Sequence, residues 1–236
     1  MSKYEEVRSR GPRLTIRYPE FAAGMQALAD QQDQHFVLVK ALCGTQGPGK
    51  STRLFDVDFV LLSVINRSLD LISGFRWSYD QWNLSTAAPI VRMQVDNLLR
   101  LALLAKAPPN SIAKTLLSGK ALRKEADPLA SPGKKHTLTD QRLREHARDR
   151  FPWIDLVYEK ASGWVHFSSV HVGVSMQVTE DRKVFGRFPS DINRYPREFL
   201  EQVLWAMRQA TSGLVEIVEG FARGKSHAAA RWEPDC

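Results

Sequence analysis

The stretch PREFLEQVLWAMRQATSGLVEIVEGFARG, residues 196–224, carries the clearest pattern in this chain. Its apolar residues recur at every third or fourth position, the spacing of one face of an α-helix. They are Phe199, Leu200, Val203, Leu204, Met207, Leu214, Ile217, Val218 and Phe221. Pro196 suits the first position of a helix and Gly224 its end. A long helix that is apolar on one side needs other helices to cover that side, so this stretch indicates a helical bundle.

Helical spacing recurs through most of the preceding chain. The segments that we predict as further helices are residues 19–43, 54–73, 83–105, 110–123, 139–150 and 152–167. Gly44, Gly74 and the Pro108-Pro109 pair suit their ends. Apolar residues alternate at period two only near residues 170–188, on both sides of a turn at residues 180–182, which predicts one β-hairpin. We therefore expect a mainly α protein, a single bundle of six or seven helices with one β-hairpin.

Length and composition bound the class of protein. The chain has 236 residues, 43% hydrophobic and 25% charged, which is typical of one globular domain. We expect a flexible basic arm over residues 1–18, a helical domain over residues 19–224 and a loose tail over residues 225–236. No apolar run reaches the roughly 18 residues that cross a bilayer. Two cysteines do not make a disulfide framework. The expectation is a cytoplasmic protein without membrane contact or cofactor.

The net charge of +7 is concentrated in one part of the chain. Residues 106–150 carry 11 basic and 5 acidic side chains. A concentrated basic segment neutralises phosphates, so RNA or DNA is a candidate partner. The alternative is a solvated, lysine-rich loop and helix face.

Residues 44–51, GTQGPGKS, match G-x-x-x-x-G-K-[ST] at every fixed position. The match resembles the Walker A loop of P-loop nucleotide triphosphatases, in which Gly44, Gly49, Lys50 and Ser51 would hold nucleotide phosphates and magnesium. Such a loop follows a buried strand and precedes a helix. Residues 36–39 could be that strand, but no later strand supplies a sheet, and Pro48 removes an N–H donor from the loop. The pattern therefore favours a loop between helices.

Two lines of polar residues lie four positions apart within otherwise apolar segments. They are Arg92, Asp96 and Arg100, and Tyr158, Ser162 and His166. Each line shares one helix face. One interpretation is a surface ion-pair ladder and a satisfied buried Tyr and His. The other is a polar pocket between two helices, with His166 in hydrogen-bonding reach of Asp96 or Arg92. Neither zinc-ligand spacing nor Cys-x-x-Cys occurs, so no metal site is expected.

A resemblance to a known family rests on the patterns Arg92-x-x-x-Asp96-x-x-x-Arg100 and Tyr158-x-x-x-Ser162-x-x-Val165-His166-x-Ser168. They resemble a group of bacterial helical proteins distantly related to the HEPN superfamily (higher eukaryotes and prokaryotes nucleotide-binding domains). The resemblance covers roughly residues 54–168 and implies a helical bundle and a homodimer. HEPN ribonucleases cleave RNA without metal, using an Arg and a His separated by four to six residues. Arg142-x-x-x-His146 is one residue short of that spacing.

The resemblance implies a protein of bacterial defence or toxin type that binds nucleic acid or cleaves RNA. Its candidate catalytic residues are His166, Arg92, Asp96 and Tyr158, with His166 or His146 as the base and an Arg stabilising the charge. Two alternatives stay open. One is a P-loop nucleotide triphosphatase or kinase that uses residues 44–51, and the other is a helical interaction module without an active site.

Overall fold

The computed structural model describes residues 13–44, 54–166, 172–173, 175–186 and 195–230. These residues form eight α-helices and one β-hairpin, which confirms the predicted fold class. The helices are α2 (Leu14–Arg17), α3 (Ala22–Cys43), α4 (Asp56–Asp80), α5 (Leu84–Lys106), α6 (Pro109–Leu117), α7 (Asp140–Ala147), α8 (Ile154–Val165) and α10 (Arg197–Ala230). Short 3-10 turns, η1 (Pro19–Phe21) and η2 (Leu122–Lys124), complete the helical part.

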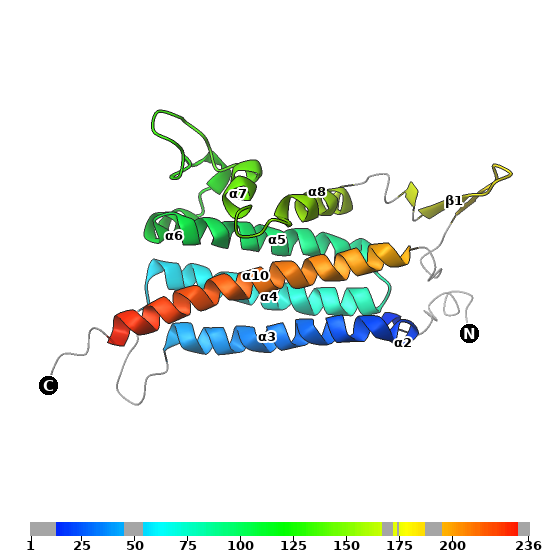
Figure 1. Cartoon of the computed structure of the whole chain (residues 1–236), viewed down its shortest axis with the longest axis horizontal. Helices are drawn as coiled ribbons and strands as arrows, with labels where there is room; N and C mark the ends of the chain where they lie inside the picture. Colours follow the sequence, from blue (N-terminus) through cyan, green and yellow to red (C-terminus); the bar gives the residue numbers. More distant parts are fainter. Residues whose placement is uncertain (1–12, 45–53, 167–171, 174, 187–194, 231–236) are drawn as a thin grey trace.

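Four long helices form the bundle. Helix α4 packs against α3 and α5, and α10 packs against the same two helices, so the four close into a ring around one core (Figure 1). Helix α6 lies against α4 and α5, while α7 and α8 lie against α5. Helix α5 is therefore covered on two sides, and 14 of its 23 residues are buried. This central position makes α5 the scaffold for the polar residues described below.

Helix α10 buries the predicted stripe and continues beyond its predicted end. Leu200, Val203, Met207 and Leu214 are buried in the core. The helix runs through Gly224 to Ala230, so the tail does not begin at residue 225. A glycine inside a helix costs only about 1 kcal/mol relative to alanine. The ion pair of Lys225, described below, holds this last part of the helix on the bundle.

Gly74 does not end α4, which continues for six residues to Asp80. The residues after Gly74 include Phe75 and Tyr79, both fully buried, so packing extends the helix. Trp82 then takes a left-handed conformation, with φ of 60°, and Asn83 N donates to Ser78 O at 2.8 Å. This arrangement is a Schellman motif, in which glycine is the usual residue.

The predicted flexible arm is ordered from residue 13. Leu14 is fully buried, and the Thr15 N–H and hydroxyl donate to Asp80 Oδ1 at 3.1 and 2.7 Å. These contacts attach α2 to the end of α4. Residues 1–12 lie outside the described part of the chain.

The hairpin is shorter than its sequence pattern. Strand β1 (Met176–Val178) pairs antiparallel with β2 (Val184–Gly186), and the pairing begins at Val178 and Val184. The predicted turn at residues 180–182 is confirmed, with Arg182 at φ of 61°. The predicted helix over residues 110–123 ends early, at Leu117, because Gly119 takes a left-handed conformation with φ of 71°.

A polar layer crosses the core of the bundle. His35 of α3 contacts Ser68 of α4 at 2.9 Å, and Gln94 of α5 donates to Ser68 Oγ at 2.6 Å and to Thr211 Oγ1 of α10 at 3.1 Å. Asn97 donates to Gln94 Oε1 at 3.2 Å. All five side chains are buried, and together they join the four bundle helices. No helix in the described ranges is both long and apolar enough to cross a membrane.

Candidate functional site

The Arg92 cluster comprises Arg92 and Asp96 of α5, Asp140 and Arg144 of α7, and Tyr158 of α8. Arg92 Nη1 donates to Asp96, while Arg92 Nη2 donates to Asp140 Oδ2 at 3.1 Å and to the Tyr158 hydroxyl. Tyr158 in turn donates to Asp140 Oδ2 at 2.7 Å. The predicted helix-face neighbours Arg92 and Asp96 thus meet Tyr158, with Asp140 as the shared acceptor.

Both guanidinium groups of the Arg92 cluster stack on the tyrosine. The Cζ atoms of Arg92 and Arg144 lie 3.9 and 4.5 Å from the centre of the Tyr158 ring. Burial and the hydrogen bond to Asp140 raise the pKa of Tyr158, and the charge of Arg92 opposes that rise. Tyr158 therefore stays protonated at neutral pH and acts as a hydrogen-bond donor. The cluster clamps α7 and α8 onto α5, and Arg144 forms its ion pair with Asp155, outside the cluster.

His166 lies apart from the Arg92 cluster. It is the exposed residue that follows α8, eight positions beyond Tyr158, or about 12 Å along the helix axis. Within the described part of the chain, its side chain hydrogen-bonds to neither Arg92 nor Asp96, which bond instead within the cluster and, for Asp96, to Arg100. Among the described residues, no hydrogen bond thus joins His166 to Asp96 or Arg92, and Tyr158 is the α8 residue that bonds to Arg92.

A second group, the Asp127 cluster, comprises Asp127, Arg142, Glu145 and His146. Asp127 Oδ2 accepts from Arg142 Nε at 3.1 Å and Nη2 at 2.8 Å, and it contacts His146 Nε2 at 2.9 Å. The Asp127 side chain is fully buried, and that of His146 is 12% exposed. Burial favours the neutral carboxyl, but hydrogen bonds from the Leu129 N–H, Arg142 and His146 outweigh it and lower the pKa of Asp127.

The ionised Asp127 fixes how His146 carries its proton. A carboxylate accepts hydrogen bonds, so His146 Nε2 carries the hydrogen and Nδ1 is left as the proton acceptor. Arg142 also donates to Glu145, which leaves two of its five N–H groups for another acceptor. The structure therefore brings Arg142 and His146 together at one carboxylate. Their spacing in the sequence is one residue short of the HEPN pattern.

The phosphate-loop alternative requires a strand just before residue 44, and the structure has a helix there. Residues 36–39 lie within α3, and Gly44, with φ of 55°, ends that helix in a left-handed conformation. Gly49, Lys50 and Ser51 lie outside the described residues. A Walker A loop follows a strand, whereas this segment follows a helix.

The basic segment 106–150 divides into two parts. In the second part each Arg side chain meets a carboxylate: Arg142 meets Asp127 and Glu145, Arg144 and Arg148 meet Asp155, and Arg150 meets Glu216. In the first part six exposed cations make no ion pair within the described residues. They are Lys114, Lys120, Arg123, Lys124, Lys134 and Lys135. We call these six residues the open cations.

Among the described residues, no group of three or more His, Cys, Asp or Glu side chains is arranged to hold a metal ion. No family model, curated protein or solved structure matches this chain.

Proposed function

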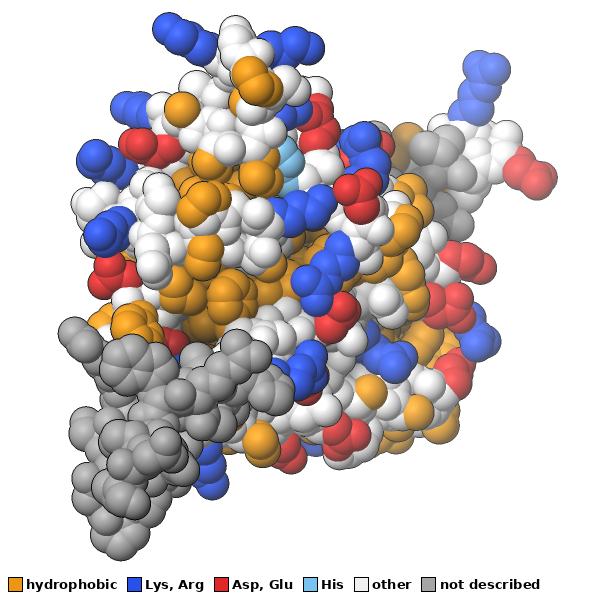
Figure 2. All heavy atoms as spheres, turned by 60° about the vertical axis from the view of Figure 1, so that its left-hand side comes forward, with side chains coloured by type: hydrophobic (Ala, Val, Ile, Leu, Met, Phe, Trp, Pro, Cys, Tyr) orange, Lys and Arg blue, Asp and Glu red, His pale blue; other side chains and the backbone are white. Residues whose placement is uncertain are grey.

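We propose that this chain is a HEPN-like protein that binds RNA through the segment joining α6 to α7. The observation that carries the proposal is the set of open cations. Residues 114–135 hold these six basic side chains and only two acidic ones, of which Asp127 is already paired with Arg142. Lys and Arg side chains spread over this part of the molecule at the top of Figure 2. Cations without a protein partner are available to neutralise phosphates.

The salt dependence of RNA affinity tests the proposal. Each phosphate contact to a single strand contributes about 0.7 to the slope of log K against log salt concentration. We expect the Lys124→Ser, Lys134→Ser, Lys135→Ser triple variant to flatten the slope by about 2. Fluorescence anisotropy of a labelled single-stranded RNA, titrated at several salt concentrations, gives the slope.

A matched control removes the same charge elsewhere. Lys183, Arg197 and Arg223 are exposed and each already meets a carboxylate, so their replacement by serine changes the net charge equally. This control triple should keep the wild-type slope. Equal flattening in both triples, or no RNA binding at low salt, overturns the proposal and favours the interaction module. A DNA strand of the same sequence tests preference for RNA.

We also propose RNA cleavage as a second function, carried by His146 and Arg142. The observation that favours it is their joint attachment to the buried Asp127 carboxylate. His146 Nδ1 takes the proton of the 2′-hydroxyl, and the 2′-oxygen forms a bond to the adjacent phosphorus. The bond from phosphorus to the 5′-oxygen breaks, and solvent protonates that oxygen. Arg142 stabilises the charge that develops on the phosphoryl oxygens.

Cleavage is measured on end-labelled RNA in the presence of a chelator. We expect products with a 2′,3′-cyclic phosphate, and none from a strand whose 2′-hydroxyls are replaced by hydrogen. The His146→Gln variant should lose cleavage while keeping RNA binding. The His166→Gln variant should retain cleavage, because His166 lies apart from both clusters. Loss in His166→Gln with retention in His146→Gln would instead restore the assignment made from the sequence.

The homodimer and the cytoplasmic location stay predictions of the sequence analysis. Sedimentation of the purified protein tests the dimer.

A further inference from the structure

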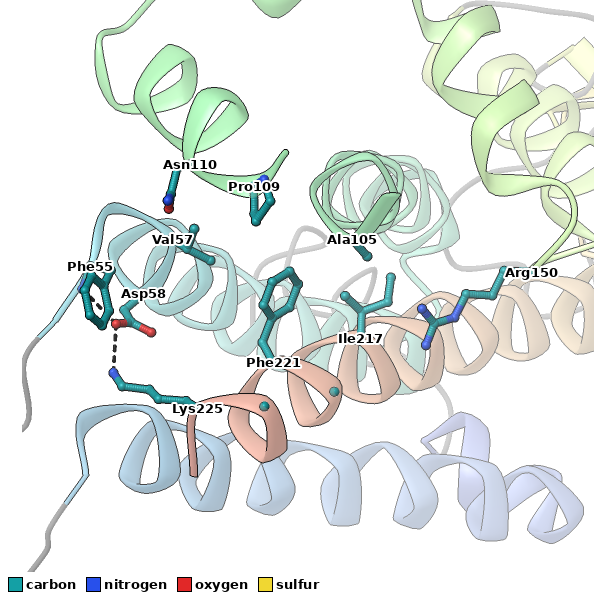
Figure 3. A pocket seen from close by; sticks show the side chains of 12 residues that line it. Phe55, Val57, Asp58, Ala105, Pro109, Asn110, Arg150, Ile217, Phe221 and Lys225 are labelled. Carbon is teal, nitrogen blue, oxygen red and sulfur yellow. Dashed lines mark hydrogen bonds and ion pairs between the residues drawn. The ribbon is translucent and has the colours of Figure 1, made fainter. Parts of the chain in front are cut away.

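A pocket of about 540 Å³ lies between the start of α4, the start of α6 and the second half of α10. Its walls are mainly apolar and come from Phe55, Val57, Ala105, Pro109, Ile217 and Phe221 (Figure 3). Figure 2 shows the same end of the molecule, where hydrophobic side chains line a hollow bordered by Lys and Arg. A volume of 300–1,000 Å³ with apolar walls is typical of small-molecule sites.

Two glycines of α10 keep this pocket empty of side chains. Gly220 and Gly224 are one helical turn apart and both line it. A Cβ atom added at either position would meet nothing within 4 Å. Glycine inside a helix is destabilising by about 0.5–1 kcal/mol relative to alanine, and here close packing does not require it. Gly213 of the same helix differs, because its missing Cβ makes room for Phe151 and Leu98.

One charged pair closes the end of the pocket. Lys225 Nζ donates to Asp58 Oδ2 and to Leu42 O, both at 2.7 Å, and its side chain is mostly buried. Asp58 also accepts from the Phe55 N–H at 2.8 Å. The pair joins α10 to α3 and α4, and its charges cancel.

Arg150 provides a hydrogen-bond donor to the pocket. Its Nε and Nη2 atoms both donate to Glu216 Oε1, at 3.1 and 2.7 Å, while Nη1 makes no hydrogen bond to any described residue. Glu216 is not among the lining residues, whereas Arg150 is, beside Ile217. Both cations of the lining are thus paired with carboxylates, and Arg150 Nη1 is the guanidinium donor available to a ligand.

We propose that this pocket binds an amphipathic organic anion. Its aliphatic or aromatic body lies against Phe221, Ile217 and the bare surface at Gly220, and its acid group accepts hydrogen bonds from Arg150. A guanidinium N–H makes its stronger hydrogen bond to an ionised acid group, so the site selects an anion over a neutral or cationic molecule with the same body. None of the open cations lines this pocket, so the proposal of anion binding does not depend on RNA binding.

Fluorescence of the arylsulfonate dye ANS provides the first measurement. We expect saturable binding to the wild-type protein, and displacement by decanoate but not by decanol or decyltrimethylammonium at the same concentration. The three competitors share one alkyl chain and differ only in the head group. Equal displacement by all three would overturn the assignment of an anion, and absence of saturable binding would overturn the site.

Two substitutions at one position separate binding from folding. Gly220→Leu places a side chain in the pocket and should abolish dye binding, while Gly220→Ala should keep it. Both replacements favour the helix, so neither should lower the midpoint of thermal unfolding. Arg150→Gln should weaken decanoate by about tenfold, the loss expected for a charge-assisted hydrogen bond. Unchanged binding in Gly220→Leu, or unchanged decanoate affinity in Arg150→Gln, contradicts the proposal.

Discussion

Two glycines in α10 predict opposite effects of one substitution. A Cβ at Gly213 would lie 2.9 Å from Phe151 Cε1 and 3.1 Å from Leu98 Cδ1, whereas a Cβ at Gly220 would meet nothing. Overpacking costs about 1–3 kcal/mol, so Gly213→Ala should lower the free energy of unfolding. Gly220→Ala should raise it by about 0.5–1 kcal/mol through helix propensity. Urea unfolding of both variants checks this, and shifts of the same sign would contradict it.

His35 predicts a pH dependence of stability. Burial lowers its pKa below the ordinary value, and the hydrogen bond to the Gln31 carbonyl opposes that shift only in part. Between the lowered pKa and about 6.5, the unfolded chain therefore binds a proton that the folded chain does not. The free energy of unfolding should fall as the pH falls from about 6.5 through this window. Urea unfolding between pH 7.5 and 5 on a grid of about half a unit measures the slope.

The control substitution replaces the titratable imidazole of His35 by a polar side chain that does not titrate. His35→Gln should be less stable than wild type at pH 7 but should lose part of the slope below pH 6.5. The carboxyl of Asp127, whose pKa is lowered, changes charge only in more acidic solution, so it does not enter this window. A slope that is the same in wild type and variant would assign the pH dependence to other groups.

Two polar faces hold helix α7 in place. On one face, Asp140 bonds to Arg92 and Arg144 stacks on Tyr158. On the other face, Arg142 and His146 contact Asp127. The carboxylate of Asp127 is thus the contact that ties the preceding loop to α7. Asp127→Ala should open this loop and speed tryptic cleavage after Lys134 and Lys135 by about tenfold, with little loss of helical ellipticity.

Asp149 offers a matched control for the Asp127 substitution. Its side chain is 85% exposed, and among the described residues its one ion pair is with Lys106. Exposed ion pairs contribute little, so Asp149→Ala should leave the cleavage rate near that of wild type. Proteolysis followed by mass spectrometry identifies the cut sites. Equal rates in Asp127→Ala and wild type would show that the loop does not depend on this carboxylate.

Sequence patterns located the elements better than their partners. The spacing of apolar residues found α3, α5 and α10, since one-sided helices must show that period. It failed at Gly74, where packing of Phe75 and Tyr79 outweighs the preference of glycine for helix ends. The i, i+4 spacing of Arg92 and Asp96 predicted their contact, but not that Asp140 would be brought to them from another helix. Asp127 lies in a loop, where no periodic pattern marks a buried carboxylate.

Charge is distributed unevenly over the whole molecule. Carboxylates pair with Arg92 and Arg142 in the two clusters, and Asp58 pairs with Lys225 beside the pocket. The excess positive charge is left on the α6–α7 connection. Pro109 and Asn110, at the start of α6, and Arg150, after the end of α7, line the apolar pocket. Helix α6 thus lines the pocket and carries Lys114, one of the open cations, which gives a physical reason to measure the proposed RNA binding and anion binding each in the presence of the other.

The polar layer yields the prediction that belongs to the whole bundle. Gln94 bonds to Ser68, Thr211 and Asn97, and so connects α5 with α4 and α10. Gln94→Leu removes these three hydrogen bonds and leaves a buried donor on Asn97, which should cost about 1–3 kcal/mol of unfolding free energy. Thr211→Val should cost less, about 0.5–1.5 kcal/mol, because it ends only one bond of the layer.

Urea unfolding at pH 7 compares the two variants, since at that pH His35 is neutral in the folded chain. We expect stability to decrease from wild type to Thr211→Val and then to Gln94→Leu. This order supports a layer whose members satisfy one another's hydrogen bonds. A Gln94→Leu protein as stable as wild type would show that an apolar core serves these helices equally well. In that case the layer would act by fixing which faces of α4, α5 and α10 meet. The variant would then show weaker near-ultraviolet circular dichroism at unchanged helix content, because loosely fixed helix faces lose specific aromatic packing.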